Sequence, residues 1–297
     1  MRIDRGFAAL LATVVIWAST FVVTKAALAD LRPLTLTFLR FLVAVGVLVP
    51  LAWRQGFRPR MALRPAYLLF GLTGVALFFT LQNVGLAYTT AVSASLIHAG
   101  TPAVIAIAAV AVLGERLASR QVVGVSLAVA GSALVALATR SSASGSNPFL
   151  GNLLMAGSVL AWTAYTLQGK RLATTADPLV STAASTLAGL LYLLPLAAWD
   201  VAAGGWPRLT VPSLGAVLYL GVAASALTLV LWNYALSLVK ASVASAFINL
   251  VPIVGTGLAL LTGEALSPLE LAGGVLALAG VWLSTQAARP SQIPAEA

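Results

Sequence analysis

The chain has no cysteine, a single histidine and few charged residues, which make up only 8% of its 297 positions. Without cysteine it can hold neither a disulfide nor a thiolate-bound metal, and it has no cysteine nucleophile. A soluble globular domain carries about 25% charged residues, so this chain has too little charge to cover a surface in water. Hydrophobic residues make up 60%, which also excludes intrinsic disorder. The composition predicts a helical protein that crosses the lipid bilayer many times, with no cofactor and no metal.

Long apolar runs fill nearly the whole sequence. A helix that crosses the hydrocarbon core needs about 20 apolar residues. The gaps between the runs are short, so we expect a stack of helical hairpins without a soluble domain. We predict ten spans, at residues 6–28, 34–53, 65–87, 91–113, 120–139, 151–169, 179–199, 213–237, 241–262 and 268–287.

The second half of the chain repeats the first. Rare residue types recur 145 to 150 positions apart, in the pairs Trp17 and Trp162, Lys25 and Lys170, Asn83 and Asn233, Pro102 and Pro252, and Gly131 and Gly280. Each repeat holds five predicted spans, and after five crossings the chain re-enters from the opposite side. We therefore expect an all-α fold of two inverted repeats, residues 1–140 and 149–289, related by an axis in the membrane plane.

Basic residues indicate the orientation of the chain. Lys and Arg number 17 against 8 Asp and Glu, and most of them fall in inside segments when the N-terminus is placed inside. Because Lys and Arg hold loops on the cytoplasmic side, we expect an inner-membrane protein with both termini in the cytoplasm. The basic residues lie in short gaps between apolar runs, so the excess charge does not indicate nucleic-acid binding.

Two paired stretches carry a resemblance to a known family. They read Pro102…Gly114-Glu115-Arg116-Leu117…Gln121…Gly124…Gly131 and Pro252…Gly263-Glu264…Leu266…Gly273…Gly280, and Thr37-Phe38-Leu39-Arg40-Phe41 adds a second-helix motif. With these motifs the chain resembles the EamA family of the drug/metabolite transporter superfamily, and within it the bacterial exporters of amino acids, including aromatic ones. The resemblance implies a ten-helix transporter that moves small metabolites, commonly outward, and not an enzyme.

Pro102 and Pro252 fall near the middle of the fourth and ninth spans. Proline removes one helical hydrogen bond and bends the helix, and a matched pair of interrupted helices is the best sequence pointer to a transporter site. We predict that the two prolines act as hinges beside a central cavity, with a passive packing kink as the alternative. Their polar neighbours Ser95, Thr101 and Asn249 are candidate substrate-binding residues.

His98, the only histidine, lies inside the fourth span. An ionisable group within the membrane is a candidate functional residue by default. It could bind a substrate carboxylate or take up a proton near neutral pH. The alternative is a neutral imidazole with a hydrogen bond to a neighbouring helix.

Aromatic residues suggest the wall of the cavity. Trp17 and Trp162 fall in the middle of their spans, whereas tryptophan usually gathers at the membrane interface. The other candidate wall residues are Phe21, Phe78, Phe79, Gln82, Tyr165 and Trp232. For each of them ordinary packing is the alternative, and Gln82 could instead fix the loop that follows its helix.

Arg40 lies some six residues into the second span, about 9 Å from its outer end at 1.5 Å per residue. At this depth a long side chain can extend to the headgroups. We expect Arg40 to anchor the helix at the outer face, with a gate contact to Asp30 or Asp200 as the alternative.

All eight acidic residues lie at or near helix ends or in loops. A pump that extrudes cations in exchange for protons needs a carboxylate within the membrane, so this mechanism is disfavoured. We predict export of small neutral or zwitterionic metabolites, above all amino acids, by alternating access around a central cavity. The alternative is an exchanger of phosphorylated metabolites or nucleotide sugars, for which Arg40, Lys25 and Lys170 would be the only phosphate ligands.

Overall fold

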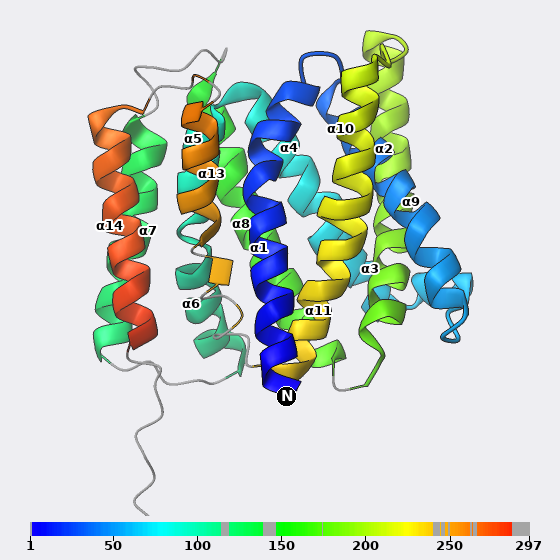
Figure 1. Cartoon of the computed structure of the whole chain (residues 1–297), viewed down its shortest axis with the longest axis horizontal. Coiled ribbons are helices and arrows are strands. Elements are labelled where there is room, and N and C mark those ends of the chain that lie inside the picture. The colour runs from blue at the N-terminus through cyan, green and yellow to red at the C-terminus, as the bar shows by residue number, and fades with distance from the viewer. Residues whose placement is uncertain are drawn as a thin grey trace, which may run out of the picture.

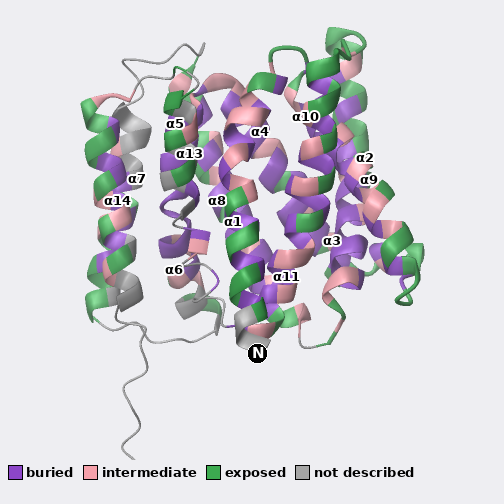
Figure 2. Ribbon diagram, in the orientation of Figure 1, coloured by how far each residue is buried: buried purple, intermediate pink, exposed green. Residues whose placement is uncertain are grey.

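The computed structural model describes residues 2–113, 119–138, 147–173, 175–239, 244, 247–248, 250–261, 263 and 266–286. Within these ranges the regular elements are all helices, and no strand occurs. The helices run close to parallel or antiparallel to one another and form one bundle (Figure 1). Buried residues gather on the faces that the helices turn toward each other (Figure 2).

The first half of the bundle contains two long helices followed by several shorter pieces. Three pieces of the chain, α3, η2 and α4, follow one another without a gap. The elements are α1 (Arg2–Ala27), α2 (Pro33–Trp53), η1 (Pro59–Leu63), α3 (Pro65–Gly71), η2 (Leu72–Leu77), α4 (Phe78–Tyr88), α5 (Ala91–His98), α6 (Thr101–Leu113) and α7 (Ser119–Ala138).

The second half has the same order of long and interrupted helices. Here α10, η4 and α11 follow one another without a gap. The elements are α8 (Pro148–Leu172), α9 (Pro178–Gly204), α10 (Val211–Gly221), η4 (Val222–Leu227), α11 (Thr228–Leu238), α13 (Leu250–Leu261) and α14 (Pro268–Gln286).

Seven segments of the described chain are long and apolar enough to cross a membrane. They are Arg5–Ala27, Pro33–Trp53, Pro65–Tyr88, Ala91–Ala108, Pro148–Leu172, Pro178–Gly204 and Val211–Leu238. Each falls on a predicted span, and two shorter apolar helices, Val122–Gly131 and Pro268–Gly280, fall on two more. Of the predicted ninth span, the structure describes residues 244, 247–248 and 250–261.

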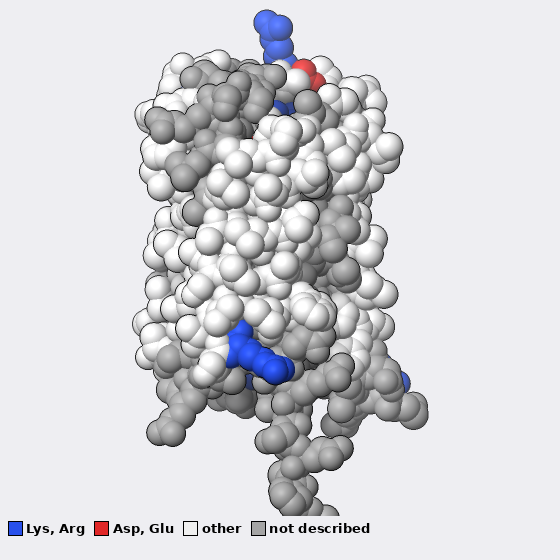
Figure 3. All heavy atoms as spheres, turned by 90° about the vertical axis from the view of Figure 1, so that its left-hand side faces the viewer, with Lys and Arg blue, Asp and Glu red and all other residues white. Residues whose placement is uncertain are grey.

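The surface agrees with a membrane setting. Large apolar side chains such as Leu11, Leu160 and Trp199 are exposed by half or more of their area. On the face seen in Figure 3, the described charges lie near the two ends of the bundle and leave its middle uncharged. The protein is therefore a multi-pass membrane protein.

The third and eighth predicted spans are not plain α-helices. Both contain a six-residue π-helix, η2 and η4, at equivalent positions of the two repeats. A π-turn shifts the backbone bonds from i−4 to i−5 and marks functional sites in many helices. Gly71 and Gly221 stand just before these segments, and a Cβ at either would collide with the neighbouring helix, α9 or α2.

The fourth span is interrupted where proline predicts a bend. Helix α5 ends at His98 and α6 begins at Thr101, so Pro102 lies in the first turn of the new helix. Proline fits there because a first-turn N–H has no helical partner to lose. Pro252 lies within α13, and its side chain is outside the described part of the structure.

Lys25 and Lys170 cap equivalent helix ends. The ammonium contacts are Lys25 to the carbonyls of Leu86 (2.9 Å) and Thr89 (2.5 Å), and Lys170 to those of Leu236 (3.0 Å) and Val239 (2.9 Å). These carbonyls belong to the ends of α4 and α11, where the last turn of a helix lacks partners. Each lysine also places its positive charge at the negative end of a helix dipole.

The two capping lysines lie at opposite ends of the bundle. Gly6, at the beginning of α1, packs against Leu238 and Val239, and Val239 supplies one of the two carbonyls that bind Lys170. Lys25 lies near the other end of α1, about 28 Å away at 1.5 Å per residue. Equivalent residues at opposite ends are what an inverted pair of repeats requires.

Helices α7 and α14 lie side by side at the left of Figure 1. They approach backbone to backbone, because a Cβ at Gly131 would strike the amide of Ala277, and one at Gly280 would strike the amide of Ala128. Small residues permit this close contact between membrane helices. The glycine pattern that the two halves share in sequence is thus a packing pattern.

Candidate functional site

A cavity opens inside the bundle, between α1, α2, α4, α5, α6 and α8. Its empty volume is about 490 Å³, counting the part open to solvent. The wall is formed by Trp17, Thr20, Phe21, Arg40, Phe78, Phe79, Gln82, His98, Thr101, Trp162, Ile248 and Val251. Most of these residues belong to the first repeat.

Aromatic rings form one side of the cavity. Trp17 and Trp162 meet edge to face, with centroids 5.1 Å apart, and Phe78 lies 4.9 Å from Trp162. The Trp17 Nε1–H donates to the Thr228 hydroxyl at 2.9 Å, so the indole nitrogen is satisfied inside the protein. The rings therefore offer the cavity apolar faces and the partial negative charge of their π systems.

Two of the predicted aromatic residues stand behind this wall. Trp232 packs on Trp17 and Trp162 at 5.4 and 5.6 Å, and Tyr165 packs 4.9 Å from Trp162, but neither lines the cavity. The Tyr165 hydroxyl accepts a hydrogen bond from Asn233 at 2.8 Å. Both rings thus support the wall and do not touch its contents.

Two further candidates do not contribute to the described wall. Ser95 is fully buried, yet it is not among the residues that line the cavity. Asn249 lies outside the described residues, so its role stays a prediction.

Arg40 is not an anchor at the outer face, which corrects the expectation from its depth. The side chain is completely buried and lines the cavity. Its Nε–H donates to the Ser225 hydroxyl at 3.0 Å, and Nη2 donates to the Ala224 carbonyl at 3.3 Å. Both partners belong to η4, so polar groups of the π-helix replace the water that Arg40 would otherwise seek. The guanidinium carbon also lies 4.4 Å over the ring of Phe79.

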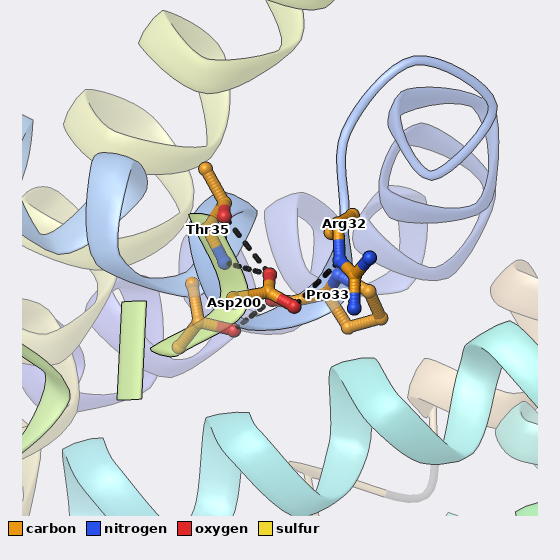
Figure 4. Close-up of polar contacts among 5 residues, drawn as sticks. Arg32, Pro33, Thr35 and Asp200 are labelled. Carbon is orange, nitrogen blue, oxygen red and sulfur yellow. Dashed lines mark hydrogen bonds and ion pairs between the residues drawn. The ribbon is translucent and has the colours of Figure 1, made fainter. Parts of the chain in front are cut away.

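The expected gate contact to Asp200 is made by another arginine. Arg32 donates from Nε to Asp200 at 2.8 Å, and Thr35 donates to the same carboxylate through its amide (3.0 Å) and hydroxyl (2.9 Å) (Figure 4). The carboxylate, carried by α9, thereby caps the beginning of α2. Asp200 thus ties the two repeats together and leaves Arg40 free of any acidic partner from α9.

His98 lines the cavity at the end of α5. A carbonyl oxygen only accepts, so Nδ1 carries the hydrogen that reaches Ala94 at 2.9 Å. On the other side, Nε2 lies 3.3 Å from the Ser158 hydroxyl, which donates to Met155 at 2.7 Å. These contacts hold the ring in place as a polar part of the wall.

Three wall residues escaped prediction. Thr20 lies one helical turn after Trp17 and so shares its face, as does Phe21, which was predicted for the aromatic wall. Ile248 and Val251 are the repeat counterparts of His98 and Thr101, and the same symmetry could have indicated them. As plain aliphatic residues they carry no chemical signal of their own.

Charge in the cavity is of one sign. Among the described wall residues, Arg40 is the only permanently charged one, and none is acidic. Gln82 and Thr101 add an amide and a hydroxyl. A wall of this kind suits a small molecule that carries an anionic group and an apolar body.

A sequence profile of the EamA-like transporter family matches residues 4–137 and 149–286. The chain belongs to this family. A probable terminal-alkyne amino-acid exporter of Streptantibioticus cattleyicolor is 31% identical over 285 residues, which is 95% of this chain and 94% of its relative. An uncharacterized transporter of Archaeoglobus fulgidus is 30% identical over 277 residues, which is 92% of this chain and 94% of the relative's chain.

A crystal structure with 19% sequence identity covers 96% of this transporter and 98% of its own chain, with a TM-score of 0.69. At that identity the likeness shows the fold alone. The EamA membership makes the chain a membrane transporter, and its cavity is the candidate place for a small-molecule substrate.

Proposed function

We propose that this EamA transporter exports small neutral or zwitterionic metabolites, above all amino acids, across the inner membrane. Ten helices in two inverted repeats, residues 1–140 and 149–289, would open the cavity to either side in turn, with both termini in the cytoplasm. The observation that carries the proposal is a cavity with aromatic faces, amide and hydroxyl groups, and a single buried guanidinium. The exporter of Streptantibioticus cattleyicolor, named for an amino-acid substrate, supports it.

The wall offers a partner for each part of an amino acid. Arg40 matches the carboxylate, because a guanidinium is the most specific protein ligand for that group. The faces of Trp17 and Trp162 match the ammonium through cation–π attraction. The apolar side chain of the substrate finds Phe78 and Phe79. An acidic residue in the wall would repel the carboxylate, and the described wall contains none.

The matched interruptions of the two repeats support alternating access. The π-segments η2 and η4 stand at equivalent positions of the two repeats, and Pro102 and Pro252 are equivalent in sequence. In many transporters built from inverted repeats, interrupted helices form the substrate site and one repeat rocks against the other around it. We propose that the two prolines act as hinges.

Exchange of phosphorylated metabolites is the second candidate, because Arg40 does lie in the cavity. A phosphate ester carries about two negative charges at neutral pH, and its recognition favours a cluster of cations. Lys25 and Lys170 donate to backbone carbonyls at the bundle ends and do not line the cavity. A single guanidinium thus matches a carboxylate better than a phosphate.

The test is transport by the purified protein in liposomes, with a panel of labelled amino acids and no imposed ion gradient. We expect flux of neutral amino acids that stops at equal concentrations on both sides. Trp199→Ala, which alters a lipid-exposed ring, serves as the control and should transport at the wild-type rate.

Two results would contradict parts of the proposal. Flux that starts only after a pH gradient is added would exclude simple facilitated export and direct attention to His98. No amino-acid flux under either condition, together with flux of a sugar phosphate, would replace the proposal by the second candidate.

A further inference from the structure

One nitrogen of the buried Arg40 guanidinium has no partner. Nε is bound by Ser225 and Nη2 by Ala224, whereas Nη1 is buried and makes no hydrogen bond among the described residues. A buried charged donor without a partner costs free energy, so native proteins seldom leave one. The cavity that Arg40 lines is the space from which a partner can come.

The described chain offers no carboxylate to this guanidinium. Asp200 is bound by Arg32 and Thr35. The other buried acid, Glu270, accepts from the Ser93 hydroxyl at 2.6 Å and from the Ser267 amide at 2.9 Å. The positive charge of Arg40 is therefore not neutralised by a described residue of the protein.

A second unpartnered group faces the same cavity. Thr101 lines the cavity, its side chain is 1% exposed, and its hydroxyl makes no hydrogen bond within the described structure. It stands at the start of α6, where the first amides of the helix lack intrahelical partners and attract negative charge. The equivalent residue of the second repeat is Val251, so the fold itself does not require a hydroxyl at this position.

We infer that Arg40 and Thr101 form the subsite for the carboxylate of the carried molecule. The carboxylate accepts from Arg40 Nη1 and from the Thr101 hydroxyl, which satisfies both orphaned donors and neutralises the buried charge. Ser225 and Ala224 act as positioning residues, since they hold the guanidinium by its other two nitrogens. This inference rests on the proposed function only in assigning the cavity to the substrate.

The subsite makes a free carboxylate, and not the ammonium, the feature that the transporter requires. A carboxamide has the same shape but no charge, so it leaves the buried guanidinium of Arg40 without a counter-charge. Such a buried mismatch is rejected more strongly than the loss of an apolar contact. The protein should therefore bind an acid without an amino group, such as 3-phenylpropanoate, and should discriminate against the matched carboxamide of any amino acid that it binds.

The experiment measures binding to the purified protein, by calorimetry or by thermal stabilisation, and so does not depend on transport. The probes are the common amino acids, the carboxamide of each one that binds, 3-phenylpropanoate and phenyl phosphate. We expect each carboxamide to bind about 10- to 100-fold more weakly than its acid, the range for one hydrogen bond to a charged group.

Two substitutions connect the discrimination to the subsite. Arg40→Lys keeps the charge but loses the planar fork, and should weaken binding of the acids about 10-fold or more while leaving the weak binding of the carboxamides unchanged. Thr101→Val, which copies Val251, should weaken acid binding several-fold without altering the fold. Arg60→Lys, at an exposed arginine outside the cavity, should bind as the wild type does.

The outcomes separate this inference from the proposed function. If binding of the acids depends on Arg40 and Thr101 but no amino acid is transported, the subsite is supported and the export function is rejected. Amino-acid flux with equal binding of acids and carboxamides would keep the function and overturn the subsite. Equal acid binding by wild type, Arg40→Lys and Thr101→Val would overturn it too, as would the absence of binding by every carboxylate. Preference for phenyl phosphate over all carboxylates would reject both.

Discussion

The two repeats share their framework and differ in the wall of the cavity. Each has a lysine that caps the end of a helix, a π-segment in the middle of a span, and a tryptophan in the aromatic cluster. Three polar residues of the first repeat that line the cavity, however, have apolar or smaller counterparts in the second repeat: Ser185 for Arg40, Ile248 for His98, and Val251 for Thr101.

This difference separates two requirements of a transporter. In a transporter that works by alternating access, equivalent packing in the two repeats allows two related shapes of similar free energy, one open to each side. A substrate, in contrast, has no two-fold symmetry, so its recognition needs different groups on the two sides of the cavity. The comparison predicts that substitutions in the framework act alike in both repeats, whereas substitutions in the wall do not.

The largest effect is expected at the backbone contact between α7 and α14. Gly131→Leu and Gly280→Leu would each force α7 and α14 apart, because even a Cβ at these positions collides with backbone. Overpacking of this kind costs about 1–3 kcal/mol or more, and both variants should lose folded protein to a similar degree. Gly215→Leu, where a Cβ meets nothing within 4 Å, is the matched control in a thermal unfolding assay in detergent.

The next effect concerns the paired tryptophans of the wall. Trp162→Ala and Trp17→Ala should each reduce transport per folded molecule about tenfold or more, since loss of a buried aromatic contact is worth more than 1.4 kcal/mol. Trp17→Ala should also lower stability further, because Thr228 loses its indole partner. If both variants transport at the wild-type rate per molecule, the aromatic cluster is not part of the substrate site.

A smaller effect tests two equivalent asparagines of the framework. Asn83 donates to Thr37 at 2.8 Å, whereas Asn233 donates to Thr182 and to Tyr165, each at 2.8 Å. Replacement by Leu should lower the free energy of unfolding by about 1 kcal/mol at Asn83 and by about 2 kcal/mol at Asn233, because each lost hydrogen bond contributes about 1 kcal/mol. Thermal unfolding of the two variants measures the difference, and a greater loss at Asn83 would contradict this reasoning.

The smallest expected effect is at the capping lysines. Lys25→Met and Lys170→Met remove the same pair of carbonyl contacts at opposite ends of the bundle. Each should cost about 0.5–1 kcal/mol, the usual value of a cation at a helix C-terminus. If the unfolding midpoint falls for one variant and stays unchanged for the other, the two lysines do not play equivalent roles in the framework.

Sequence reasoning found the framework because the framework leaves long patterns. Apolar runs of span length predicted where helices lie, and the repeat of tryptophan, lysine and proline predicted equivalent positions. Trp17 and Trp162 were found in this way, and both line the cavity. The π-segments were not predicted, since the same residues fit an α- or a π-helix and tertiary packing selects between them.

Sequence reasoning was wrong about Arg40 because depth does not give direction. Counting along α2 placed the side chain within reach of the membrane surface. Its actual partners, Ser225 and Ala224, lie in the other repeat and form part of a π-helix that sequence did not indicate. Tyr165 and Trp232 show the same limit, because a pattern along one helix does not distinguish the wall from the layer behind it.

The central claim is that one asymmetric cavity holds the transported amino acid, and the absence of cysteine allows a direct measurement. Ile248→Cys introduces the only thiol of the chain into the apolar side of the wall, and its rate of modification by a small thiol reagent is measured in liposomes. We predict that a transported amino acid slows the modification and that its carboxamide does not, while Ser237→Cys, at an exposed position, reacts at one rate throughout. An equal rate at Ile248→Cys with and without the amino acid would contradict the claim.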